Sequence, residues 1–452
     1  MTIQNRTHKK AAVKLSGHFD YRTLLRFTFP SIVMLVFTSI YGVVDGFFVS
    51  NYVGKTPFTA VNFIMPFLLI MGSAGFMFGT GGSALISKTI GEGKQKEADS
   101  LFSLIVYTSA VFGIVLAFAG LAFIRPLAAA LGAQGQLLEY SVIYGRILLA
   151  AIPAYILQYA FQCLFAAAGK PVLGLLVTAG AGIANILFDA LFIIVFRWGL
   201  EGAAAATAAS QLVGGLLPLL YFARPNSSLL HLGRTHFDSR SLLKTCSNGS
   251  SELMSNISMS IVSMLYNAQL LKYAGEDGVA AYGVLMYVSL IFQGIFIGYS
   301  VGAAPVTGYH YGAQNHDELK GLLKKSLVLI SFFAVLMFAS SYALARPLSV
   351  IFTGYDETLL NLTVRGFSIF AFSFLFSGFA IFASAFFTAL NNGLVSASIS
   401  FLRTFVFQSA AVLIFPLFWD VDGIWLSIVA AEMLAVLVAA LFLKANRLKY
   451  HY

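Results

Sequence analysis

The chain has 452 residues, of which 58% are apolar or aromatic and only 10% are charged, whereas a soluble protein carries about 25% charged residues. So few charged residues cannot cover the water-exposed surface of a protein of this length, which excludes a soluble globular protein. The formal net charge is +9, from 28 Lys and Arg against 19 Asp and Glu. Because these basic residues lie in short gaps between apolar runs, they indicate membrane topology rather than nucleic-acid binding.

Twelve apolar runs are long enough to cross a bilayer, which takes about 20 residues per helix. We expect spans near residues 24–52, 58–88, 98–122, 138–166, 172–196, 201–222, 245–273, 278–309, 319–342, 358–388, 394–418 and 423–443. Pro30 lies inside the first run and is expected to bend that helix, because proline removes a backbone hydrogen bond. The sequence therefore predicts an all-α polytopic membrane protein.

The distribution of Lys and Arg predicts the orientation in the membrane. If the N-terminus is cytoplasmic, 19 basic residues fall on the inside, five on the outside and four within spans. Positive charge concentrates on the cytoplasmic side of membrane proteins. We therefore expect a multi-pass protein of the plasma membrane with both termini in the cytoplasm.

The two halves of the chain are related by a constant offset of 221 residues. The offset carries Arg125-Pro126 onto Arg346-Pro347, Gly81 onto Gly302 and Trp198 onto Trp419. Each half has six spans, so the halves enter the membrane from the same side and form two six-helix bundles related by a pseudo-two-fold along the membrane normal. The predicted units are a cytoplasmic tail 1–22, an N-lobe 23–222, a cytoplasmic linker 223–243, a C-lobe 244–443 and a cytoplasmic tail 444–452.

Polar side chains within the N-lobe spans lie at one predicted depth, roughly 10 Å below the outer rim at 1.5 Å per residue. They are Asp45, Tyr144, Asp189 and Thr207, and Asn185 lies one turn before Asp189 on the same helix face. Intramembrane charges are functional candidates by default, and a structural polar network is the alternative. The positions equivalent to Asp45, Asn185, Asp189 and Thr207 in the second half are Tyr266, Val406, Ala410 and Ile428. Since none of these is acidic, the comparison favours a cation or proton site that is present in the N-lobe alone.

The C-lobe has its own intramembrane charges, Glu252, Arg403 and Glu432. Arg403 is expected to pair with Glu432 or with Glu252, because a lone charge in this environment is costly. A structural role for this network is preferred to substrate binding, which stays open as the alternative.

Several short motifs resemble the multidrug and toxic compound extrusion (MATE) family across all twelve spans. They are Pro30 followed by Asp45, Gly91-Glu92-Gly93-Lys94, Ala168-Gly169-Lys170, Asn185 and Asp189 followed by Gly202 and Thr207, and Tyr311-Gly312-Ala313-Gln314-Asn315. The resemblance to the DinF-like branch implies that Asp45, Tyr144, Asn185, Asp189 and Thr207 form an N-lobe cation site. The NorM-like branch uses an acidic residue on helix ten that this sequence lacks, although Glu252 occupies the family's helix-seven acidic position.

The sequence predicts a transporter and not an enzyme, because no nucleophile and base, metal cluster or nucleotide motif is evident. The stretch 81–89 resembles a phosphate-binding loop but lacks the glycine before Lys88. The resemblance implies a secondary antiporter that exports organic, cationic and amphipathic compounds in exchange for H+ or Na+, works as a monomer and needs no cofactor. The alternative is a flippase for lipid-linked sugar precursors, which would need several arginines within the spans.

The predicted orientation can be tested with single cysteines. Residues near Lys94, Ser239 and Lys320 are expected to face the cytoplasm, and residues near Lys55, Arg125 and Lys272 the outside. An impermeant thiol reagent applied to whole cells should label cysteines only in the second set. Labelling of the first set would reverse the orientation.

Overall fold

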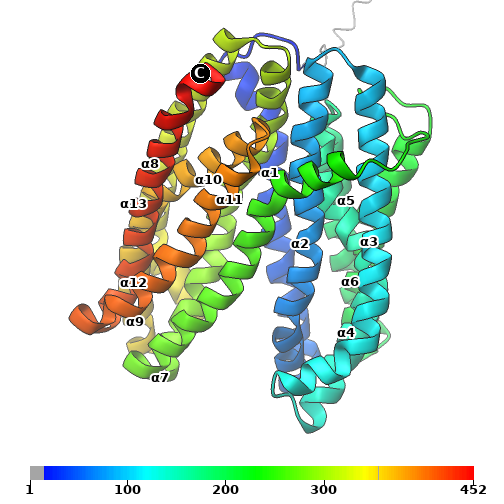
Figure 1. The fold of residues 1–452 in the computed structure, drawn as a ribbon. Helices are drawn as coiled ribbons and strands as arrows, with labels where there is room; N and C mark the ends of the chain where they lie inside the picture. The colour runs from blue at the N-terminus through cyan, green and yellow to red at the C-terminus, as the bar shows by residue number, and fades with distance from the viewer. Residues whose placement is uncertain (1–14, 355) are drawn as a thin grey trace, which may run out of the picture.

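The computed structural model describes residues 15–354 and 356–452, and this part of the chain contains helices and no strand. The long helices run side by side from one end of the molecule to the other (Figure 1). A bilayer offers no partners for backbone N–H and C=O groups, and a helix satisfies them within the segment. The apolar composition and the all-helical fold therefore have the same cause.

The first half of the chain contains six membrane-spanning segments. The N-lobe consists of α1 (Tyr21–Phe48) with the π-helical segment η1 (Val49–Val53), α2 (Lys55–Gly91), α3 (Gln95–Ala130), α4 (Gly135–Ala167), α5 (Pro171–Asp189) with the π-helical segment η2 (Ala190–Val195), and α6 (Gly199–Ala223). Pro30 lies inside α1, whose backbone stays helical on both sides of it.

The second half also contains six spans, although its helices are divided differently. It consists of α7 (Ser239–Gly312), α8 (His316–Thr353), α9 (Glu357–Phe370), η3 (Ala371–Ser373), α10 (Phe374–Ala389), α11 (Gly393–Phe401), the π-helical segment η4 (Leu402–Phe407), α12 (Gln408–Ile414) and α13 (Pro416–Tyr450). The 74 residues of α7 are broken at Gly275 by a φ of 65°, so α7 provides two spans. Residues 357–389 and 393–414 provide one span each, and α8 and α13 complete the six. The predicted twelve spans are confirmed.

Turns at equivalent positions confirm the repeat. Three pairs of residues 221 positions apart have a positive φ, and they are Gly54 and Gly275, Gly93 and Gln314, and Gly199 and Asp420. Glycine adopts this conformation without strain, and side chains such as Asp tolerate it in turns. The halves therefore share their turn geometry even where one of them has replaced the glycine.

The lobes meet backbone to backbone near one end of the bundle, where α1 and α2 pack against α7. A Cβ atom at Gly81 would overlap the carbonyl oxygen of Thr245, and one at Gly249 would overlap that of Met77. Gly91 and Gly312 make a reciprocal contact, since each faces a carbonyl oxygen of the other's helix. Gly91 and Gly312 are equivalent in the repeat, so this crossing lies close to the pseudo-two-fold axis.

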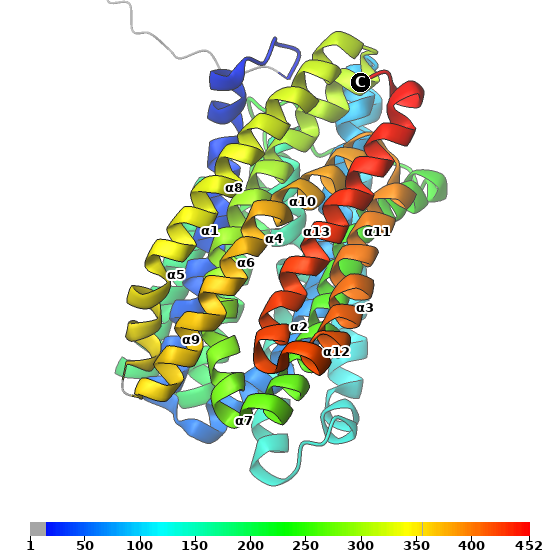
Figure 2. The ribbon, with the colours of Figure 1, turned by 90° about the vertical axis from the view of Figure 1, so that its left-hand side faces the viewer.

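Both ends of the described chain lie at the end of the bundle where these glycines meet (Figures 1 and 2). The segment before α1 is held by the C-lobe, because the carboxylate of Glu318 on α8 accepts a hydrogen bond from the Phe19 N–H at 2.9 Å and contacts His18 Nδ1 at 2.6 Å. The Phe19 side chain is fully buried. The N-terminal segment thus joins the two lobes at this end.

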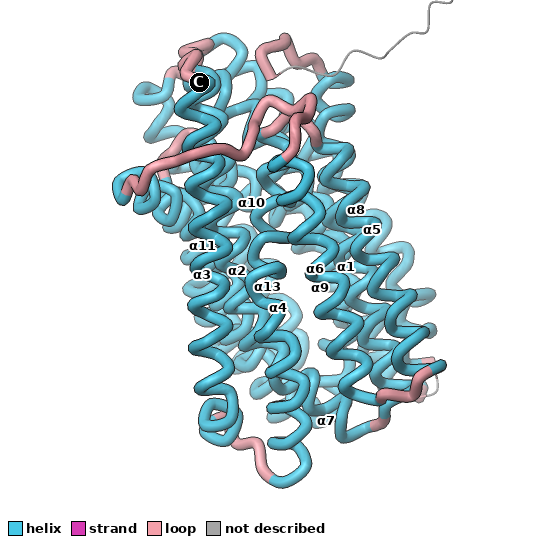
Figure 3. The backbone as a smooth tube through the Cα atoms, turned by 90° about the vertical axis from the view of Figure 1, so that its right-hand side faces the viewer, coloured by secondary structure: helices cyan, strands magenta, loops and turns pink. Residues whose placement is uncertain are grey.

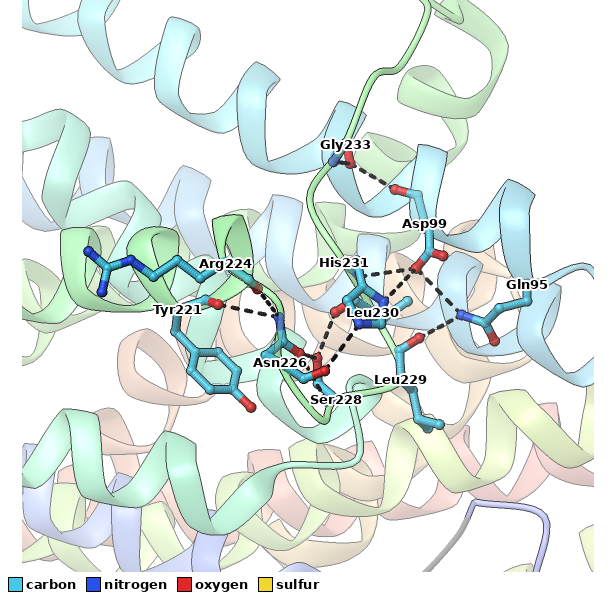
Figure 4. Close-up of polar contacts among 11 residues, drawn as sticks. Gln95, Asp99, Tyr221, Arg224, Asn226, Ser228, Leu229, Leu230, His231 and Gly233 are labelled. Carbon is cyan, nitrogen blue, oxygen red and sulfur yellow. Dashed lines mark hydrogen bonds and ion pairs between the residues drawn. The ribbon is translucent and has the colours of Figure 1, made fainter.

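The segment between the lobes, residues 224–238, crosses the bundle near the same end (Figure 3). It lies along the start of α3, where Gln95 donates to the Leu229 carbonyl at 2.6 Å and Asp99 accepts from the His231 N–H at 3.1 Å (Figure 4). The Gly233 N–H donates to Ser103 at 3.0 Å, and Leu230 is fully buried. This connection is therefore packed against the N-lobe over most of its length.

The close contact between the lobes predicts a steric limit at Gly249. Replacement of Gly249 by Ala should lower the unfolding temperature of the purified protein, because the new Cβ meets α2 backbone that has no rotamer to change. Overpacking of this kind costs about 1–3 kcal/mol. Gly283→Ala is the matched control on α7, since its Cβ would meet open space. Equal unfolding temperatures for the two variants would contradict this steric limit.

Candidate functional site

The structure brings the five predicted N-lobe residues together from four helices. Asp45 comes from α1, Tyr144 from α4, Asn185 and Asp189 from α5, and Thr207 from α6. Asp45, Tyr144, Asp189 and Thr207 lie six to nine residues from the end of their helical segments away from the termini, which is roughly 9–14 Å along a helix. Asn185 lies one turn further in than Asp189 on α5. The similar depth of these side chains therefore reflects their similar distances from the turns at that end of the bundle.

The two carboxylates form the centre of this group. Asp45 and Asp189 lie within hydrogen-bonding reach of each other, with Asn185 beside Asp45. The Thr207 hydroxyl donates to Asp45 Oδ1 at 3.3 Å. Asp45 is 8% exposed, and Asn185, Asp189 and Tyr144 are almost completely buried. Two acidic groups in contact away from water repel each other unless a proton or a cation lies between them.

Several polar atoms of the group have no hydrogen-bond partner in the part of the chain that the structure describes. They are both carboxylate oxygens of Asp189, Nδ2 of Asn185 and the hydroxyl of Tyr144. Buried polar atoms are normally paired, and an orphan often marks a water or ion position. The oxygens of Asp45, Asp189, Asn185, Thr207 and Tyr144 are hard ligands of the kind that hold a small monovalent cation, and the carboxylates can equally take a proton.

Irregular helical geometry accompanies the intramembrane charges. The π-helical segment η1 begins four residues after Asp45, η2 begins directly after Asp189, and η4 contains Arg403. π-Helical turns are rare and occur frequently at functional sites, because they change the direction of a side chain without ending the helix.

The C-lobe position equivalent to Asp45 is filled by an aromatic pair. Tyr266 stacks on Tyr282 with ring centroids 5.2 Å apart, and its hydroxyl lies 2.7 Å from that of Ser427. Tyr266 is 2% exposed. Packing and a satisfied hydroxyl thus stabilise the C-lobe at the place where the N-lobe has an acidic group.

The C-lobe charges form one tight pair and one separate carboxylate. Arg403 Nε donates to both oxygens of Glu432, at 3.0 and 2.8 Å. Only 11% of the Arg403 side chain and 2% of the Glu432 side chain are exposed. Of the two partners considered from the sequence, the structure places Glu432 against Arg403, whereas Glu252 forms no ion pair within the described residues.

A central cavity lies between the lobes. Thr80, Ser83 and Cys163 line it from the N-lobe, and Glu252 and Arg403 are among the residues that line it from the C-lobe.

Some polar residues of the two sites were not identified from the sequence. Asn256 and Gln293 line the central cavity, and Tyr41 lies near both Gln158 and Asp45. Asn256 follows Glu252 by one helical turn, which places both on one face. This spacing could have indicated Asn256 from the sequence, whereas no sequence pattern indicates Gln293 or Tyr41.

The MatE family model matches residues 30–191 and 253–412. The chain belongs to the MatE family. It is similar to the multidrug export protein MepA of Staphylococcus haemolyticus, with 26% identity over 323 residues that cover 70% of each chain. It is also similar to the protein of the same name from Staphylococcus aureus (strain MRSA252), with 22% identity over 424 residues that cover 93% of each chain.

The fold is that of solved MATE structures. A crystal structure of MATE in complex with MaL6 aligns with a TM-score of 0.91 and 22% identity, over 96% of this chain and 98% of that chain. This likeness concerns the fold, with its twelve spans in two bundles. The predicted family is confirmed by the family model, whose matched residues include Asp45, Tyr144, Asn185 and Asp189.

Because Arg403 pairs with Glu432 and not with Glu252, we expect the two acidic residues to behave differently when each is combined with an Arg403 mutation in this MatE protein. Arg403→Ala should reduce the yield of folded protein, because an unpaired buried carboxylate costs about 3 to 5 kcal/mol. Adding Glu432→Ala should restore the yield, whereas adding Glu252→Ala should not. The measurement is monodisperse protein after detergent extraction. If neither double variant recovers, the pair does not explain the loss.

Proposed function

We propose that this protein is a secondary active antiporter that exports organic, cationic and amphipathic compounds in exchange for inward H+ or Na+. The observation that carries the proposal is the contact between the Asp45 and Asp189 carboxylates, with the Asp189 oxygens lacking a donor among the described residues. Such a pair has a different charge with and without a bound cation. The similarity to proteins named multidrug export protein MepA supports the choice of organic compounds as cargo.

Coupling requires that the cation have different affinities for two arrangements of the lobes. A proton or Na+ between Asp45 and Asp189 removes their repulsion and lets α1 and α5 stay together. Loss of the cation leaves two like charges in a partly desolvated pocket and drives the helices apart. Pro30 lies in the same helix as Asp45, where a missing backbone hydrogen bond makes bending less costly.

The chemistry of the cavity also bears on the flippase alternative. A pyrophosphate-linked lipid needs several cationic groups at its site, yet Arg26, Arg146 and Arg365 are exposed. Arg403 lines the cavity and is already paired with Glu432. This distribution favours export of organic compounds over transport of lipid-linked sugar precursors.

Location and orientation complete the proposal. The bacterial relatives and the twelve spans favour the plasma membrane, and the excess of basic residues at the end that holds the termini favours a cytoplasmic position for both termini. Cargo then enters the central cavity from the cytoplasm and leaves to the outside, with the small organic compound and the bilayer as the partners of a monomer. This role needs no catalytic group and no cofactor beyond the coupling ion.

The coupling site is tested in vesicles with separately imposed pH and sodium gradients. Asp45→Asn and Asp189→Asn should each reduce gradient-driven export to the level seen without a gradient, because an amide cannot exchange its charge. Asp277→Asn is the matched control, since Asp277 is exposed, and it should leave export unchanged. Full export by both Asn variants under either gradient would refute the N-lobe site.

A further inference from the structure

The short segment 15–20 leads into α1 of the N-lobe but is bound by side chains of the C-lobe. Leu15 and Phe19 are 2% and 0% exposed, in one apolar core with Leu319 and Leu322 of α8. We propose that this segment is a strap that holds the lobes together at the end of the bundle that carries the termini, and that it detaches from α8 when the lobes separate there. The proposal rests on the movement between two arrangements of the lobes described above, and it names a contact that sets the balance between them.

Two charged side chains of α8 bind the backbone of Phe19, and we call them the receptor for the strap. One carboxylate oxygen of Glu318 accepts a hydrogen bond from the Phe19 N–H at 2.9 Å, and the other lies 2.6 Å from Nδ1 of His18. The Lys325 ammonium donates to the Phe19 carbonyl oxygen. Glu318 and Lys325 are seven residues apart and therefore share one face of the helix. Both backbone groups of Phe19 are thus held by charge-assisted hydrogen bonds, which are stronger than neutral ones.

The Phe19 ring is the apolar anchor of the strap. It meets the ring of Phe27 edge-on with centroids 5.9 Å apart, and it meets the ring of His310 on α7 edge-on at 6.3 Å. His310 is 2% exposed and also lies beside the backbone of Leu15 and Gly17. The strap therefore contacts both α7 and α8, and its two apolar side chains are closed off from solvent.

The repeat shows that the shared architecture does not require this strap. The residues 221 positions after Leu15 and Phe19 are His236 and Arg240. Both are exposed, so the segment before α7 has no apolar anchor at these positions. The C-lobe nevertheless folds into the same six spans.

The receptor is also particular to the C-lobe. Glu97 is the N-lobe equivalent of Glu318, but its side chain is 59% exposed and lies 3.9 Å from Lys94. Leu104 takes the place of Lys325. At this position a groove lies between the start of α3 and residues 236–241. One side of the junction between the lobes is therefore strapped, whereas its counterpart in the repeat is open.

The receptor keeps its charges balanced when the strap leaves. Glu318 Oε1 lies 3.9 Å from Lys325 Nζ, and only 10% and 17% of these side chains are exposed. A buried charge that loses its partner is costly, but these two groups remain beside each other. Detachment therefore loses the hydrogen bonds to Phe19 and the burial of its ring, and it leaves no lone charge in the C-lobe. A contact with this property can form and break repeatedly.

The proposal is tested by electron paramagnetic resonance distance measurements between the lobes, on the full chain in lipid nanodiscs without a gradient or cargo. Spin labels are attached at Lys96→Cys and Lys444→Cys, two exposed positions close to the start of α3 and the end of α13. The background carries Cys163→Ser and Cys246→Ser, which remove the native thiols. The readout is the ratio of the longer-distance population, with the lobes separated at this end, to the shorter-distance population.

Glu318→Ala combined with Lys325→Ala removes the receptor as a pair and should raise this ratio at least about tenfold, because losing a single hydrogen bond to a charged group has an effect of that size. Phe19→Ala should raise the ratio as well. A strap that is already detached cannot be released again, so the combined variant should rise by less than the product of the two factors. A rise equal to that product would contradict a single strap.

Glu318→Gln covers the case in which the alanine pair does not fold, since it keeps the size of the side chain and one acceptor for the Phe19 N–H. It should raise the ratio by a smaller factor. The matched control is Arg365→Gln with Asp422→Asn, an exposed ion pair elsewhere in the C-lobe, which should leave the ratio unchanged. An unchanged ratio in the folded receptor variants, or an equal rise in the control, would overturn the proposal.

The same material separates this inference from the transport proposal. If the strap variants shift the distances but no gradient drives export from vesicles, the antiport proposal fails and the strap stands. If a gradient drives export while the strap variants leave the distances unchanged, the antiport proposal stands and the strap is refuted.

Discussion

The contact between glycine backbones at one end of the bundle is the constraint on which the arrangement of the lobes depends. Gly81, Gly249, Gly91 and Gly312 let carbonyl groups of one lobe approach the other more closely than any side chain permits. Without water to drive association, membrane helices gain stability from close packing of this kind. Because the contact lies near the pseudo-two-fold axis, two copies of one six-helix unit can be sealed at that end and enclose a cavity between them.

The duplicated architecture has diverged in its polar groups. The N-lobe has Asp45 and Asp189 in contact, whereas the C-lobe fills the position of Asp45 with the stacked pair Tyr266 and Tyr282. The C-lobe in turn has charges at the cavity wall where the N-lobe is neutral. Two nearly equivalent scaffolds thus hold different polar groups, and the proposed coupling site rests on this difference.

The buried charges of the two lobes differ in whether the protein itself neutralises them. Arg403 neutralises Glu432 within the protein, so that this pair keeps one charge state whatever is bound nearby. Asp45 and Asp189 have no such internal cation among the described residues, so their charge depends on an ion from outside. Uncompensated charge in low dielectric is unstable, and this is why the Asp45–Asp189 pair, and not the internally neutralised pair, is proposed as the coupling site.

The sequence by itself determined the number of spans, the repeat and the N-lobe cluster. Hydropathy, a constant offset and the depth of a residue within a helix can all be read from the order of residues along the chain. The sequence also limited the partner of Arg403 to two acidic residues. Only the tertiary structure decided that the partner is Glu432 and that Glu252 shares a cavity with Arg403. These features depend on how each helix is rotated about its axis. In spans that are apolar on every face, such as α10 with its many phenylalanines, the sequence pattern leaves that rotation open and the packing of neighbouring helices sets it.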